Sequence, residues 1–135
     1  MSPQKKGLII AIATDDEKYY INRHFGDAER YLIYRLTDTE CKYLKKIENT
    51  TEEENDKVHA DPIKAGSIAK ILKAEGVQVL VSRAFGPNIK RVIKKFACVL
   101  VREKQIKLSW EKLIENYTTI KQKCEEGEGR KHIRI

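Results

Sequence analysis

The sequence predicts an α/β protein of three layers, in which helices cover both faces of a five-stranded mixed sheet. Short runs rich in β-branched residues alternate along the 135-residue chain with segments whose apolar residues recur at helical spacing. Two neighbouring runs, 31–36 and 41–47, are separated by only four residues, which favours an antiparallel hairpin. Segments with helical spacing separate the later runs, as is typical of parallel strands.

The first half of the chain supplies three strands. Residues 8–13 are all apolar and rich in isoleucine, which indicates a strand buried within the sheet. The run 31–36 follows, and the polar turn 37–40 joins it to 41–47. Lysines at positions 42, 45 and 46 place this third strand at an exposed edge, because charged side chains there discourage pairing with another sheet.

A helix opens the second half of the chain at Asp61-Pro62. Asp61 is a favoured capping residue, and a proline at the first helical position needs no N–H donor. Gly76 is placed to end this helix. The apolar run 77–81 then predicts a fourth, buried strand.

Two more helices and a fifth strand complete the predicted domain, residues 1–120. Gly86-Pro87 opens a helix that is apolar at positions 89, 92, 93 and 96, and the run 97–101 is a buried strand. The last helix begins near Ser109. Residues 121–135 are rich in Glu, Lys, Arg and Gly, which predicts a charged, mobile tail.

The sequence argues against a membrane-spanning, a secreted and a disulfide-rich protein. No apolar run approaches the ~20 residues of a membrane span, and the stretch before the first strand is too short for a signal peptide, so we expect a cytoplasmic protein. The three cysteines, Cys41, Cys98 and Cys124, are odd in number and widely spaced. This pattern argues against a disulfide framework and against a self-contained zinc knuckle.

Positive charge is concentrated in the middle of the chain. The net charge is +7 overall, and residues 63–107 alone carry 11 basic and 2 acidic side chains. Such a field attracts RNA, DNA or an anionic metal cluster, although it is equally compatible with a simple solvated face. Lys90, Arg91, Lys94 and Lys95 are the expected outer residues of the second helix.

Two loops are predicted to meet where the parallel strands end. The first contains His24-Phe25-Gly26, in which Phe25 anchors the loop by burying its ring and Gly26 permits a sharp turn. The second, 82–87, contains Arg83 and Gly86 and leads into a helix N-terminus, which favours negative charge. Open α/β sheets bind ligands at this edge. The alternative is that His24 bonds its own turn and that 82–87 is an ordinary connection.

A few further residues are candidates for metal binding or catalysis. Imidazole and thiolate groups suit iron, which makes His24, Cys41 and Cys124 the candidate metal ligands. Cys98 falls within a strand and is interpreted as a core residue, whereas His59 and His132 are interpreted as solvated. The carboxylates of Asp15 and Asp16 follow the first strand and allow a metal-dependent hydrolase, but a strand-end turn explains them more simply.

The motifs resemble a known family. The strand 9–14, the sequence His24-Phe25-Gly26-Asp27-Ala28, the strand 31–34, the helix from Asp61 and the segment 77–87 are similar to the dinitrogenase iron–molybdenum cofactor biosynthesis family over about residues 7–120. The resemblance implies a ribonuclease-H-like, nitrogenase-accessory-factor type of fold. The family histidine maps onto His24, and the glycine turn onto Gly86.

This resemblance also implies a function. It favours a non-enzymatic carrier for an iron–sulfur cluster or an iron-containing cofactor precursor, with metallocluster donor and acceptor proteins as partners. Arg83 and Phe85 stand where the family turn is usually smaller and richer in glycine. The alternatives are a nucleic-acid-binding module that uses the basic segment 63–107 and, less favoured, the hydrolase on a ribonuclease-H-like scaffold.

Overall fold

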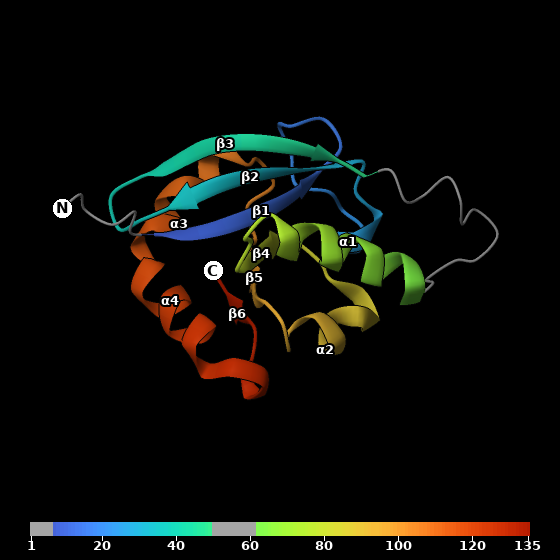
Figure 1. Ribbon diagram of the computed structural model, residues 1–135. Coiled ribbons are helices and arrows are strands. Elements are labelled where there is room, and N and C mark those ends of the chain that lie inside the picture. Colours follow the sequence, from blue (N-terminus) through green and yellow to red (C-terminus); the bar gives the residue numbers. More distant parts are fainter. Residues whose placement is uncertain (1–6, 50–61) are drawn as a thin grey trace.

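A mixed sheet forms the centre of the computed structural model, which describes residues 7–49 and 62–135 (Figure 1). Within these residues the sheet has six strands in the order β3-β2-β1-β4-β5-β6. Strands β1 (Leu8–Thr14), β2 (Arg30–Leu36) and β3 (Cys41–Glu48) pair antiparallel, as predicted for the hairpin. Strands β4 (Val79–Ser82), β5 (Ala97–Leu100) and β6 (Ile133–Arg134) continue the sheet parallel to β1.

The sixth strand corrects the sequence prediction. We expected five strands and a charged tail over 121–135, but this segment contains the end of a helix and strand β6, whose Ile133 pairs with Val99 of β5. Arg130, only 8% exposed, donates hydrogen bonds to the carbonyl oxygens of Ile93, Lys123 and Cys124. One guanidinium therefore ties the C-terminal segment to the rest of the molecule, despite its charged composition.

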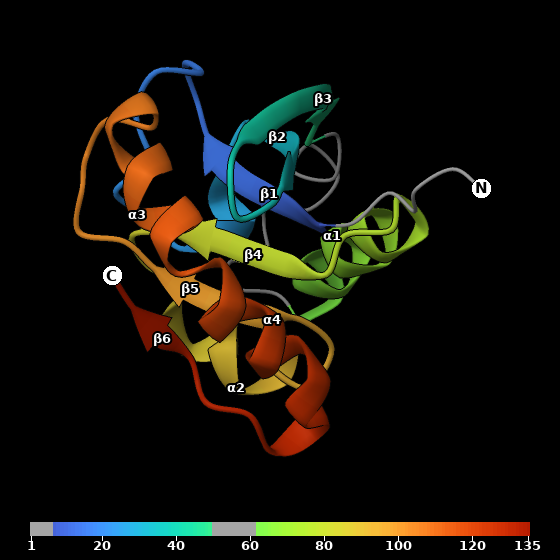
Figure 2. The ribbon, with the colours of Figure 1, turned by 90° about the vertical axis from the view of Figure 1, so that its left-hand side faces the viewer.

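Helices cover both faces of the sheet, as predicted (Figure 2). On one face, α1 (Pro62–Ala74) and α2 (Ile89–Val92) lie over a core that includes Leu72, Leu80 and Phe96. On the other, α3 (Trp110–Glu115) and α4 (Tyr117–Glu126) cover a second core that includes Leu113 and Ile120. No helix in the described ranges is long and apolar enough to cross a membrane.

The helices differ from the prediction at their ends. Helix α1 begins at Pro62 and is followed by Gly76 at φ +84°, whereas the expected cap Asp61 lies outside the described residues. Gly86–Asn88 forms a 3-10 turn, so that α2 is only four residues long. The helix expected from Ser109 onward is divided at Asn116 into α3 and α4.

Candidate functional site

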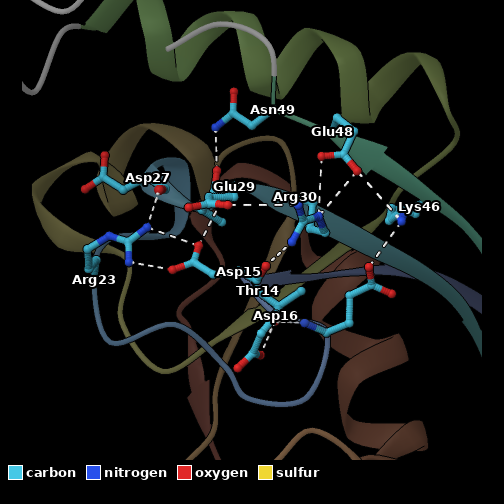
Figure 3. A network of polar contacts seen from close by, with 12 residues as sticks. Thr14, Asp15, Asp16, Arg23, Asp27, Glu29, Arg30, Lys46, Glu48 and Asn49 are labelled. Atoms are coloured by element: carbon cyan, nitrogen blue, oxygen red, sulfur yellow. Dashed lines mark hydrogen bonds and ion pairs between the residues drawn. The ribbon is translucent and has the colours of Figure 1, made fainter. Parts of the chain in front are cut away.

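The loop after β1 is closed on itself by charged side chains (Figure 3). The guanidinium of Arg23 donates to both carboxylate oxygens of Asp15, at 2.7 and 3.1 Å, and to the carbonyl oxygen of Asp27. Asp15 also accepts a hydrogen bond from the backbone N–H of Glu29. The Arg23 side chain holds the pKa of Asp15 below its ordinary value. Loop residues on either side of His24 are thereby fixed to one another.

Further polar contacts fasten this loop to β2 and β3. Arg30 of β2 donates to the carbonyl oxygen of Asp15 and forms an ion pair with Glu48 of β3 at 3.3 Å. The side-chain amide of Asn49 donates to the carbonyl oxygens of Gly26 and Ala28. As Figure 3 shows, these side chains converge on the loop from separate elements. They hold the backbone on both sides of His24.

The same network bears on the hydrolase hypothesis. Asp15 is committed to Arg23, and Asp16 accepts hydrogen bonds from the backbone N–H groups of Lys18 and Tyr19, both at 2.9 Å. Within the described part of the chain, no group of three or more His, Cys, Asp or Glu side chains is arranged to hold a metal ion. The two carboxylates therefore shape the loop, as the strand-end-turn interpretation supposes.

Phe25 joins the two predicted loops. It is 5% exposed, and its ring stacks on Phe85 of the second loop with centroids 5.4 Å apart. The Tyr31 hydroxyl donates to the carbonyl oxygen of Phe25 at 2.9 Å, and the two rings also touch. The expected role of Phe25 as an anchor is confirmed, and the loops after β1 and β4 meet at one edge of the sheet.

The imidazole of His24 lies against Gly86. Gly86 has φ +71°, and a Cβ built on it would be 2.5 Å from Cγ and Nδ1 of His24. His24 is exposed, so the ring lies beside the turn without being buried in it. We call this arrangement, formed by His24, Phe25, Ser82, Arg83 and Gly86, the His24–Gly86 site.

Gly26 plays a smaller part than the sequence suggested. It lies in the 3-10 turn Phe25–Asp27 outside the left-handed region, and a Cβ on it would meet nothing within 4 Å. Gly26 does lie in a turn, as predicted, but this turn does not require a glycine. The steric requirement falls on Gly86, which, alone among the glycines whose surroundings the structure describes, combines a positive φ with a neighbouring ring.

Two polar groups beside the turn have no partner within the described ranges. The Ser82 hydroxyl is fully buried, and the Nε of the half-buried Arg83 is also shielded from solvent. Buried polar atoms are normally hydrogen-bonded, so such groups at the end of β4 suit a ligand that accepts hydrogen bonds. Ser82 is a residue that sequence reasoning missed, and its signal was a serine that ends the apolar run 79–81.

The helix N-terminus contributes less than predicted. Four residues of α2, preceded by a 3-10 turn, align few peptide dipoles. The positive charge of the site therefore comes mainly from Arg83.

The two candidate cysteines lie away from His24. Cys41 pairs with Leu36, which pairs with Leu8, so it sits at the opposite end of the sheet from Thr14 and the His24 loop. The Cys124 sulfur is 4.0 Å from the carbonyl oxygen of Gln78, just before β4 begins. Burial raises the pKa of Cys41 to about 12 and also raises that of Cys124. The structure does not bring either thiol to the imidazole.

Cys98 and two further histidines were also interpreted from the sequence. Cys98 is 1% exposed in the core, as expected. His132 precedes β6, and His59 lies outside the described residues.

A comparison with protein families bears on this site. The family model described as dinitrogenase iron-molybdenum cofactor matches residues 6–120. The chain belongs to the dinitrogenase iron-molybdenum cofactor family. The match confirms the resemblance seen in the sequence and includes both loops of the His24–Gly86 site, whereas β6 lies beyond it. This family comprises cofactor-biosynthesis and carrier proteins. No curated protein matches the chain.

Proposed function

We propose that this protein is a non-enzymatic cytoplasmic carrier of an iron–sulfur cluster or a related iron-containing cofactor precursor, attached at the His24–Gly86 site. Family membership supports the class of cargo. The observation that carries the proposal is the position of the exposed His24 ring. It lies so close to Gly86 that no side chain would fit at position 86. An accessible imidazole on a loop whose backbone is held by neighbouring residues is suited to bind iron.

The donor set fits a preassembled cluster better than a bare metal ion. A protein site for a single ion needs several side-chain ligands, and the described residues bring together no such group. A preassembled cluster has its own bridging sulfides and can keep small thiolates, or ligands from a partner protein, on its other irons, so that one imidazole can attach it through one iron. A single attachment of this kind is easily exchanged with donor and acceptor proteins. The half-buried guanidinium of Arg83 would donate hydrogen bonds to the sulfides of an anionic cluster.

Loading the protein without oxygen from a preassembled iron–sulfur cluster that carries small thiolate ligands tests the proposal. We expect wild-type protein to take up iron and to develop visible absorption, and His24→Ala to lose most of both. His132→Ala is the matched control, since it removes the imidazole before β6 and leaves the site intact. Equal uptake by His24→Ala and wild type would remove His24 from the site.

Nucleic-acid binding through residues 63–107 is the second candidate. Lys90, Arg91, Lys94 and Lys95 are all exposed, as predicted. The phenylalanines beside them, Phe85 and Phe96, are buried and offer no surface for base stacking. Binding through these four side chains would therefore be electrostatic, falling steeply with salt and lost on reversing their charges.

A further inference from the structure

A pocket of about 390 Å³ lies on the α3 side of the sheet and shares no residue with the His24–Gly86 site. Its walls come from three parts of the chain: the loop after β1, the middle of β2, and the segment leading from β5 into α3. The lining residues are Glu17, Lys18, Tyr19, Tyr34, Gln105, Ile106, Lys107 and Trp110. Its volume is within the range of small-molecule sites, about 300–1,000 Å³. We call it the Trp110 pocket.

Aromatic rings form much of the lining. The rings of Tyr34 and Trp110 are in contact, with centroids 4.6 Å apart, and Tyr43 meets Tyr34 edge-on from β3. Tyr19 also lines the pocket and is 47% exposed, so its ring is accessible to a ligand. These flat surfaces suit a flat heteroaromatic ligand, because stacking on aromatic side chains tolerates any planar ring.

The charges of the pocket favour an anion. Lys18 and Lys107 are exposed, and neither forms an ion pair with another residue of the described ranges. The only acidic lining residue, Glu17, is paired with Lys46 at 3.1 Å. The unpaired ammonium groups therefore leave the pocket with positive charge.

Backbone contacts hold the walls in place. The N–H of Tyr20 donates to the carbonyl oxygen of Lys104, and the N–H of Ile106 donates to that of Lys18. Glu17 has φ +68°, a strained conformation for a residue with a side chain, and its N–H donates to the Thr14 hydroxyl. Strain of this kind persists where surrounding contacts fix it, often at binding sites.

We propose that the Trp110 pocket binds a nucleotide unit, with the base stacked against the aromatic rings and the phosphate between Lys18 and Lys107. The side-chain amide of Gln105 offers both a donor and an acceptor to the edge of a base. The same chemistry is presented by a free nucleoside monophosphate and by one unit of a single-stranded RNA. The proposal is independent of cluster binding at His24.

Trp110 is the single tryptophan of the chain, and its fluorescence reports directly on the pocket. We titrate the full-length protein with AMP, with an adenosine oligoribonucleotide and with inorganic phosphate, exciting the tryptophan where the base does not absorb. Saturable quenching by AMP is expected, with phosphate alone giving none. Quenching by the oligonucleotide alone would identify a polymer as the source of the unit.

Two substitutions make the test specific. Lys107→Glu, at an exposed position, is expected to weaken binding at least tenfold, and Tyr19→Ala to weaken it about tenfold through lost stacking. Lys121→Glu, an equal charge reversal on exposed α4, leaves binding unchanged, as does His24→Ala. Absence of quenching by both AMP and the oligonucleotide, or equal quenching in Lys107→Glu and wild type, would overturn the proposal.

Discussion

Replacing Gly86 by alanine separates folding from the placement of His24. Gly86 is left-handed at φ +71°, and this conformation costs a residue with a side chain about 1–2 kcal/mol. The new Cβ would lie 2.5 Å from the imidazole, so the ring must move. Because His24 is exposed, the ring moves into solvent at little cost, and we expect the free energy of unfolding to fall by about 1–2 kcal/mol.

A four-variant cycle of wild type, Gly86→Ala, His24→Ala and the double variant measures both effects. In urea unfolding the two substitutions should add within about 0.5 kcal/mol, because the backbone strain at Gly86 does not depend on the ring. In iron uptake they should not add, since each single variant already removes the imidazole from the site. A stability cost that vanishes in the His24→Ala background, or full iron uptake by Gly86→Ala, would refute the reasoning.

Three further predictions concern polar contacts that hold the fold together. Asp15→Asn should lower the free energy of unfolding by about 0.5–1 kcal/mol at pH 7. Because Arg23 lowers the pKa of Asp15, the difference persists above about pH 5 and shrinks as the pH falls through that lowered pKa, which urea unfolding at pH 7 and pH 3 checks. Ser109→Ala should cost about 1–3 kcal/mol because it leaves the buried Tyr20 hydroxyl without an acceptor, and thermal unfolding should show Tyr20→Phe to be milder. Arg130→Gln should cost about 1.5–3 kcal/mol and speed hydrogen exchange in β6; unchanged exchange there would contradict the anchoring role of this residue.

Most of the fold could be predicted because the strands and helices carry local signals. The apolar run 8–13 and the short turn 37–40 led to the correct central strand and hairpin. Strand β6 was missed because Ile133 and Arg134 form a strand only by pairing with β5. Likewise, the hydrogen bonds of Arg130 involve carbonyl groups as distant in sequence as Ile93, and no local pattern reveals them.

The site was predictable in its loops but not in its details. A ring at position 25 signalled an anchor, and its partner proved to be Phe85. A glycine follows each of these phenylalanines. The sequence alone does not show that, of these two glycines, Gly86 has a positive φ and Gly26 does not. The position of Cys41 could have been predicted. Cys41 directly follows the turn 37–40, and this turn lies at the opposite end of β2 from the His24 loop, which precedes β2.

Attachment of the cluster through His24 is tested most directly by pulsed electron paramagnetic resonance of reduced, reconstituted protein labelled with ¹⁵N-histidine. If His24 binds the cluster, one imidazole nitrogen shows a hyperfine coupling to it. This coupling is retained in His132→Ala and absent in His24→Ala. A loaded wild-type protein without nitrogen coupling, or a coupling that survives in His24→Ala, would contradict attachment through His24.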